Sequence, residues 1–173
     1  SAGVDTAIDT TGDVGQWTSI YCPATDDCKI SYYDVTNGDL KFRDCDDATC
    51  STGITRTVDS TNNVGQYTSI YCPATDDCKI SYYANDATLQ DLKFVDCNDP
   101  DCESGTATIT TVDSTGNVGQ YTGNYCPTAT DCKISYYDVT NGDLKFRDCG
   151  DAACSIGTTR TVDSTNNVGQ YTS

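Results

Sequence analysis

The chain has 173 residues, with 26 acidic and 10 basic side chains, a net charge of −16 and no histidine. So acidic a surface repels nucleic-acid phosphates and anionic lipids, and the lack of histidine removes the usual general base and imidazole metal ligand. No apolar run approaches the roughly 18 residues of a membrane-spanning helix. The composition therefore argues against a nucleic-acid partner, a membrane span and histidine-based catalysis.

A Gly-Gln-aromatic motif recurs four times and exposes an internal repeat. Successive motifs are separated by 50, 54 and 50 residues, and a period of this length indicates one small structural unit per copy. The motifs begin at Gly15, Gly65, Gly119 and Gly169. On this alignment the chain divides into an orphan last strand of a preceding unit (1–13), three repeats (14–63, 64–117 and 118–167) and the start of a fourth unit (168–173).

Within the first repeat, four short segments alternate in polarity with a period of two, which is typical of β-strands. In chain order they are Gln16–Cys22, Cys28–Asp34, Asp39–Cys45 and a strand near Ile54–Val58. Between the second and third strands, Asn37-Gly38 favours a type I′ hairpin turn, because both residues tolerate a positive φ. The third repeat has the same dipeptide, and the second has lost it.

The repeats have the length and strand content of propeller blades. The sequence therefore predicts an all-β fold of about three tandem, four-stranded, antiparallel, blade-like units. A closed propeller needs at least about four blades, so these units are not expected to close within one chain.

The segments GQYTSI, ISYYD, TNGDLKF and the DCxxxxC turn resemble the tandem repeats of large secreted bacterial proteins with β-propeller-like architecture. The resemblance covers nearly the whole chain and recurs with each repeat. It implies an extracellular, non-enzymatic protein. It implies no particular ligand and no functional residue.

Twelve cysteines fall into pairs, and each pair flanks a short polar loop between two strands. Residues that face each other across an antiparallel hairpin lie about 4.5 to 5.5 Å apart, within disulfide range. Zinc is the alternative, but the spacing and the lack of histidine fit it poorly. We therefore predict local disulfides and an oxidising, extracellular location. The predicted pairs are Cys22–Cys28, Cys45–Cys50, Cys72–Cys78, Cys97–Cys102, Cys126–Cys132 and Cys149–Cys154.

A Tyr-Tyr pair recurs in every repeat and is followed by Asp in two of them. One ring of each pair must face away from the core of its own unit. That ring could stack on a sugar while the carboxylate accepts a hydroxyl hydrogen bond, or it could pack between neighbouring units. The candidate glycan contacts are Tyr33, Asp34, Tyr83, Tyr137 and Asp138.

Oxygen-bearing side chains also gather around two of the hairpin turns. Hard oxygen ligands on a turn suit Ca²⁺. The alternative is an Asx turn, in which Asp and Asn bond their own loop backbone. Calcium is the only cofactor that the sequence suggests. The candidate ligands are Asp34, Asn37, Asp39, Asp138, Asn141 and Asp143.

Asp44, Asp96 and Asp148 recur at one position of the third strand. Each is expected to pair with a last-strand arginine such as Arg56 or to cap the adjacent disulfide turn. A glycoside-cleaving site needs two carboxylates with different roles, whereas these acids repeat uniformly. No catalytic residue is therefore predicted.

Unpaired sheet edges at the two ends of the chain would be templates for another chain. Three explanations stay open: a segment of a longer repeat protein, protomers joined head to tail with a terminal strand of one completing the sheet of the next, or several chains closed into a ring. The residues predicted to carry assembly are Val4, Ile8, Trp17, Thr159, Val162 and Tyr171.

The leading prediction is a structural protomer of an extracellular filament or cell-surface appendage, whose main partner is another copy of itself. The alternative is a lectin-like, carbohydrate-binding propeller module that uses the Tyr-Tyr-Asp motifs. Glycans, bound or O-linked, are the second expected partner.

Overall fold

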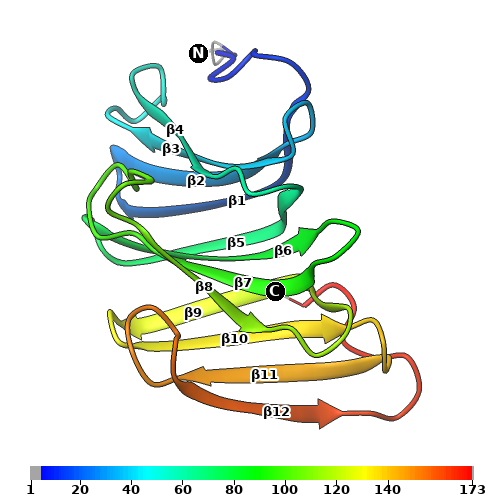
Figure 1. Ribbon diagram of the computed structural model, residues 1–173. Helices are drawn as coiled ribbons and strands as arrows, with labels where there is room; N and C mark the ends of the chain where they lie inside the picture. Colours follow the sequence, from blue (N-terminus) through cyan, green and yellow to red (C-terminus); the bar gives the residue numbers. More distant parts are fainter. Residues whose placement is uncertain (1–4, 173) are drawn as a thin grey trace.

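The computed structural model describes residues 5–172 and is built from three four-stranded antiparallel sheets (Figure 1). The first sheet contains β1 (Val14–Ala24), β2 (Asp27–Asp34), β3 (Asp39–Cys45) and β4 (Gly53–Asp59). The second contains β5 (Val64–Ala74), β6 (Asp77–Asn85), β7 (Gln90–Asp96) and β8 (Thr108–Asp113). The third contains β9 (Val118–Thr128), β10 (Asp131–Asp138), β11 (Asp143–Cys149) and β12 (Gly157–Asp163).

Each sheet is a meander in which strands that are consecutive in the sequence pair with one another. The sheets follow one another through the molecule, from the blue first sheet to the red end of the third (Figure 1). The first strands β1, β5 and β9 are neighbours in this stack. The prediction of an all-β fold of three four-stranded units that do not close within one chain is confirmed.

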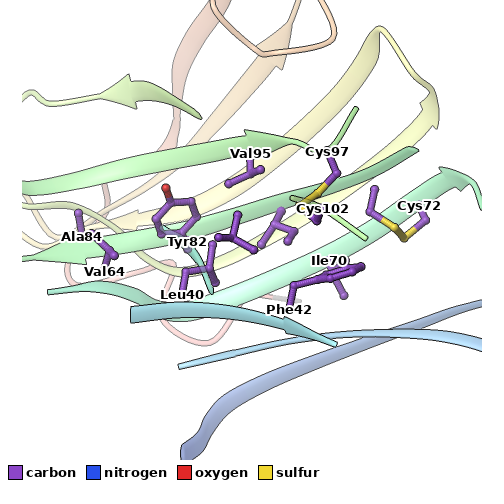
Figure 2. Close-up of a cluster of buried hydrophobic side chains, with 13 residues drawn as sticks. Leu40, Phe42, Val64, Ile70, Cys72, Tyr82, Ala84, Val95, Cys97 and Cys102 are labelled. Atoms are coloured by element: carbon purple, nitrogen blue, oxygen red, sulfur yellow. A yellow bond between two sulfur atoms is a disulfide. The ribbon is translucent and has the colours of Figure 1, made fainter. Parts of the chain in front are cut away.

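The apolar cores lie between the sheets. Leu40 and Phe42 of β3 are fully buried against the second sheet, where Phe42 lies beside Ile70 of β5 (Figure 2). Leu92 and Phe94 occupy the same positions in the second sheet and are fully buried in the cluster formed with the third sheet. Because one sheet alone leaves one apolar face uncovered, each unit depends on the next for burial.

Residues 5–13 do not form the predicted orphan strand. They run without strand structure, and Val4 lies outside the described residues. The first sheet already contains its own four strands, so no strand of this segment completes it. Every described sheet supplies its own last strand, and the joining of protomers by strand completion stays a prediction.

The turn between β2 and β3 also differs from the prediction. Gly38 has a φ of 77°, but Asn37 does not have a positive φ, so the turn is not type I′. The loop spans four residues, because Asp34 pairs with Asp39, and Gly38 N donates to Asp34 O at 2.8 Å. The longer loop removes the need for two residues with a positive φ.

Each first strand carries a bulge near its start. In β1 the register shifts between Gln16 and Ser19, and Trp17 has a φ of 49°. The equivalent residues Tyr67, Tyr121 and Tyr171 have φ values of 52°, 51° and 59°. Positive φ is rare for bulky side chains, and a bulge re-aims the side chain that it carries. The bulge therefore turns one aromatic ring per unit out of the regular strand alternation.

Candidate functional site

A polar contact joins each sheet to the one before it. Asp59, at the end of β4, is buried and accepts hydrogen bonds from Tyr82 Oη at 2.7 Å and Lys93 Nζ at 2.8 Å. Both donors belong to the second sheet. Burial opposes ionisation of Asp59, but the bonds from Lys93 and Tyr82 outweigh it and hold the pKa of this carboxyl below its ordinary value. We call this arrangement the junction triad.

The triad recurs at the next junction and at the start of the stack. Asp113 accepts from Tyr136 Oη at 2.7 Å and Lys145 Nζ at 2.6 Å. Asp9 accepts from Tyr32 Oη at 2.7 Å, and Lys41 Nζ lies 3.9 Å away. The segment around Asp9 thus takes the place that the end of a preceding last strand would have.

The fourth copy of the carboxylate is Asp163, at the end of β12. It is exposed and accepts a bond from Thr165 N at 2.8 Å, as Asp59 does from Thr61 N at 2.9 Å. No tyrosine or lysine among residues 5–172 forms the rest of a triad with it. Asp163 therefore keeps the loop contact that Asp59 makes, but it lacks the tyrosine and lysine contacts that Asp59 receives from the following sheet.

The second tyrosine of each Tyr-Tyr pair lies between neighbouring units. Tyr33, Tyr83 and Tyr137 are buried, and their hydroxyls donate to Asn63, Asn117 and Asn167 respectively. Asp34 and Asp138 are also buried. In this position none of the five side chains can stack on or bond a sugar, so the predicted glycan contacts are corrected to packing between units.

The residues predicted as calcium ligands lie at the turns between the second and third strands of the first and third units, where two of the aspartates bond their own loop. Asp34 Oδ1 accepts from Asn37 N at 3.1 Å and Asp34 Oδ2 accepts from Asn37 Nδ2 at 2.8 Å. Asp138 and Asn141 repeat these contacts, and Asp39 and Asp143 stand opposite the two aspartates in the strand pairing. Within residues 5–172 no group of three or more acidic or cysteine side chains could hold a metal ion. Each turn therefore uses its carboxylate to close its own loop.

The third-strand aspartates pair with lysine, not with arginine. Asp44 lies opposite Lys29 in the register of β2 and β3 and forms an ion pair with its ammonium group. Lys79 and Lys133 form the equivalent pairs with Asp96 and Asp148. Arg56, the expected partner, instead contacts Asp101 of the second sheet at 3.3 Å. The prediction was wrong because the residue opposite Asp44 on β4 is Ile54, whereas Arg56 stands opposite Phe42.

Cysteines form disulfides at all six predicted positions. The pairs across the first hairpin of each unit have Cα–Cα separations of 4.0, 4.0 and 4.1 Å, and the pairs that close the loop after the third strand have 4.7 Å each. No cysteine in the described chain is free. In each sheet, these crosslinks fix the loop after the first strand and the loop after the third strand.

A ladder of four aromatic rings runs across the sheets. The ring centroids of Trp17 and Tyr67 are 4.9 Å apart, those of Tyr67 and Tyr121 are 4.6 Å apart, and those of Tyr121 and Tyr171 are 4.5 Å apart. These are the bulge residues with positive φ. Together with Thr18 and its equivalents they line an open groove of about 270 Å³. Sequence reasoning missed the ladder, although the repeated Gly-Gln-aromatic motif marks its positions.

The two ends of the stack expose residues that are buried at the internal junctions. At the end of the third sheet, Leu144 and Phe146 are only partly buried, whereas their equivalents in the first two sheets are fully buried. Val162 is 60% exposed, and its equivalent Val58 is 2% exposed. We call the surface formed by Leu144, Phe146 and Val162 the tail face. A hollow of about 300 Å³ lies beside Phe146.

At the other end, Val14, Ile20 and Ile30 of the first sheet form what we call the head face. Ile20 is 61% exposed, whereas its equivalent Ile70 is 5% exposed and packs at the first internal junction. Ile8 lies at this face, in the lining of a hollow of about 180 Å³ with Ile30. The head and tail faces are thus the two halves of an interface that the chain already forms twice.

The residues predicted to carry assembly are divided between these ends. Ile8 and Trp17 lie at the head, and Val162 and Tyr171 lie at the tail. Thr159, on the outer strand β12, is half-buried and accepts a bond from Arg147 at 3.3 Å. Its contact is therefore internal to the third sheet.

No protein-family model and no curated protein matches the chain. The fold is similar to a crystal structure of an exo-β-1,3-galactanase variant from Phanerochaete chrysosporium with β-1,3-galactotriose, at a TM-score of 0.57 and 9% identity. The similarity covers 88% of this chain and 39% of the galactanase chain. At this identity the likeness concerns the fold alone, and the chain spans about two fifths of that structure. Residues 5–172 contain no helix long and apolar enough to cross a bilayer.

Proposed function

We propose that the protein is a non-enzymatic, extracellular structural protomer whose copies join end to end, with the tail face of one packed on the head face of the next. One observation carries this proposal: Phe42 and Phe94 are fully buried at the two internal junctions, whereas Phe146 at the tail face is not. A joint between different faces that does not close on itself produces a filament. The expected assembly is therefore a filament built from stacked sheets.

The first internal junction supports this pairing of the two faces. At the first junction Ile70 packs in the cluster that contains Phe42 (Figure 2). Ile20 has the position of Ile70 at the head face, and the hollow beside Phe146 has the position that Ile70 fills. Burying Ile20 in that hollow would contribute about 1 to 2 kcal/mol. The six disulfides support an extracellular site, because disulfides persist in oxidising compartments.

The test compares two exposed isoleucines by electron microscopy and sedimentation velocity. Ile20 and Ile156 are both 61% exposed. The equivalent of Ile156 in the first unit is Thr52, which is exposed although another sheet follows that unit, so Ile156 is not expected to lie in a joint. Ile20→Asp should abolish assembly, and Ile156→Asp should leave it unchanged. A wild-type protein that stays monomeric at high concentration, or an Ile20→Asp variant that still forms filaments, would contradict the proposal.

A carbohydrate-binding role is the second candidate, and the aromatic groove favours it. Trp17, Tyr67, Tyr121 and Tyr171 offer partly exposed rings beside threonine hydroxyls, a combination that suits sugar rings. The similarity in fold to a galactanase is compatible with it. A glycan array with the wild type and a Tyr67→Ala variant separates the candidates. Binding that the variant loses would favour the carbohydrate role.

A further inference from the structure

We infer that the accessible tyrosines stacked across the junctions are sites of oxidative crosslinking, at which dityrosine bonds join one sheet to the next. The oxidant is of the peroxidase type, which removes single electrons and consumes hydrogen peroxide. The inference concerns the junctions inside one chain, so it holds whether or not copies join end to end. It adds a covalent modification to the structural role.

The twelve tyrosines divide into two groups of six. The first group is buried, and its hydroxyls donate to aspartates or asparagines at the junctions. The second group is half-buried or exposed, and each member stacks on an aromatic ring of another unit. The accessible tyrosines are therefore the ones that meet a ring across a junction. They are Tyr21, Tyr67, Tyr71, Tyr121, Tyr125 and Tyr171.

Three of these rings, those of Tyr21, Tyr71 and Tyr125, form what we call the tyrosine column. They come from the first strands β1, β5 and β9, which are neighbours (Figure 1). The ring centroids of Tyr21 and Tyr71 are 4.5 Å apart, and those of Tyr71 and Tyr125 are 5.0 Å apart. Tyr21 packs against the buried cluster of the first junction, and Tyr71 packs against that of the second. Each of these two rings thus reaches over the boundary between two sheets.

The hydroxyl ends of the column rings meet. Hydrogen bonding to Tyr21 is the main cause that raises the pKa of the Tyr71 hydroxyl, and Tyr125 hydrogen-bonds the same hydroxyl. Two phenoxyl radicals couple at the ring carbons next to their hydroxyls. The arrangement therefore brings together the atoms that a dityrosine bond joins.

The coupling step balances in electrons and protons. Each of two tyrosines loses one electron and its hydroxyl proton, which leaves two neutral phenoxyl radicals. A carbon–carbon bond forms between the rings, and the hydrogen on each joined carbon moves to oxygen and restores a hydroxyl. The two electrons and two protons that were removed reduce one molecule of hydrogen peroxide to two molecules of water. The product has lost two hydrogen atoms.

A dityrosine bond would add a connection that the disulfides do not make. The six disulfides join cysteines that are five or six residues apart, and within the described chain none of them crosses a junction. A bond between Tyr21 and Tyr71 would span a whole repeat of 50 residues. Closing a long loop restricts the unfolded chain more than closing a short one.

The aromatic ladder makes the two junctions unequal. Across the second junction it offers a further pair, Tyr67 and Tyr121, with ring centroids 4.6 Å apart. Across the first junction the ring that meets Tyr67 is Trp17, which has no phenol and gives no dityrosine. Among residues 5–172, the first two sheets can therefore be joined by dityrosine only through the column, whereas the second and third have two pairs.

The test treats the full chain, dilute and with its disulfides intact, with a peroxidase and hydrogen peroxide. Dityrosine survives the reduction of disulfides, so tryptic peptides of the reduced product are mapped by mass spectrometry. We expect the peptide that contains Tyr21 to be joined to the one that contains Tyr71, with the loss of two hydrogen atoms. The product should run as a single chain on a reducing gel, and its thermal unfolding midpoint should rise by about 10 °C.

Two phenylalanine variants locate the bond. Tyr21→Phe keeps the ring but removes the hydroxyl that the phenoxyl radical requires. It should lose the crosslink between the first and second sheets and keep one between the second and third. Tyr83→Phe is the matched control, because Tyr83 is buried, donates to Asn117 and lies outside the column and the ladder. This variant should crosslink like the wild type.

Three results would overturn the inference. The first is an oxidised wild type that contains no dityrosine, or contains it only between molecules. The second is a crosslink between the first and second sheets that persists in Tyr21→Phe. The third is an equal loss of this crosslink in Tyr83→Phe. None of these results depends on whether the wild type forms filaments, so the proposed assembly is judged separately by Ile20→Asp.

Discussion

Replacing Asp59 with asparagine should destabilise the whole stack, because this carboxylate joins two sheets. Asp59 accepts hydrogen bonds from Tyr82 at 2.7 Å and Lys93 at 2.8 Å, and all three side chains are buried. Asparagine keeps the shape and removes the charge, so Lys93 keeps its ammonium group without an anion. Breaking one side of a buried ion pair costs about 3 to 5 kcal/mol. The Lys93 side chain is 10% exposed, so we expect a value near the lower limit, about 3 kcal/mol.

The assay is urea unfolding followed by circular dichroism, with the disulfides left intact. Asp163→Asn is the matched control, since Asp163 is the exposed copy of the same residue, and its cost should stay within about 0.5 kcal/mol. Combining Asp59→Asn with Lys93→Met removes both charges and should recover most of the loss. Equal costs for Asp59→Asn and Asp163→Asn, or no recovery in the double variant, would refute the argument.

Acid should reproduce the effect of the substitution in the wild type. The folded-state pKa of Asp59 and that of Asp113 lie below the ordinary value of 3.8. A carboxyl whose pKa is lowered by folding contributes stability that is fully present above its unfolded pKa and is lost as the pH falls through the folded pKa. The free energy of unfolding should therefore decline below about pH 4, with a shallower decline in Asp59→Asn. Identical pH profiles for the two proteins would mean that Asp59 is not linked to folding.

Four further variants test the packing and the crosslinks. Phe94→Ala should cost about 3 to 5 kcal/mol in urea unfolding because Phe94 is fully buried, and Phe146→Ala should cost the monomer clearly less; equal costs would show that the tail face is not open. Gly65→Ala should cost more than about 2 kcal/mol, because the residue has a positive φ and the added Cβ meets backbone, and a neutral result would contradict the close approach. Replacing Cys45 and Cys50 together with serine should cost about 2 kcal/mol on the loop-entropy account, and should lower the number of disulfides in the non-reduced intact mass by one.

Features that depend on neighbours in the sequence could be predicted. The strands follow from alternation within seven or eight residues, and the third strand begins and ends at the expected Asp39 and Cys45. The disulfides follow because Cys22 and Cys28 face each other across one hairpin, a distance that the hairpin alone determines. Each of these features depends only on the geometry of one unit, and the same sequence pattern recurs in every repeat.

Features that depend on the next unit could not be predicted. The sequence shows that Asp59 recurs in each repeat, but not that it meets Tyr82 of the following sheet. That contact depends on how sheets lie on one another, which alternation within a strand does not reveal. The same holds for Trp17: its motif is visible, but the bulge and the positive φ that aim its ring at Tyr67 are not. The Tyr-Tyr pairs were ambiguous between sugar contact and packing for this reason.

Because the same junction repeats, the two ends of a stack of these sheets differ, whatever the number of units. The first and second sheets bury Leu40 and Leu92 on the sheet that follows, where Gly65 and Gly119 receive them. The two sides of the joint differ, so the last sheet always presents the leucine side and the first sheet the glycine side. Residues 5–13 and 168–172 cover these sides only in part, since hollows remain beside Ile30 and Phe146. On the proposed end-to-end assembly, the surface that fits each of these sides is the opposite end of another copy.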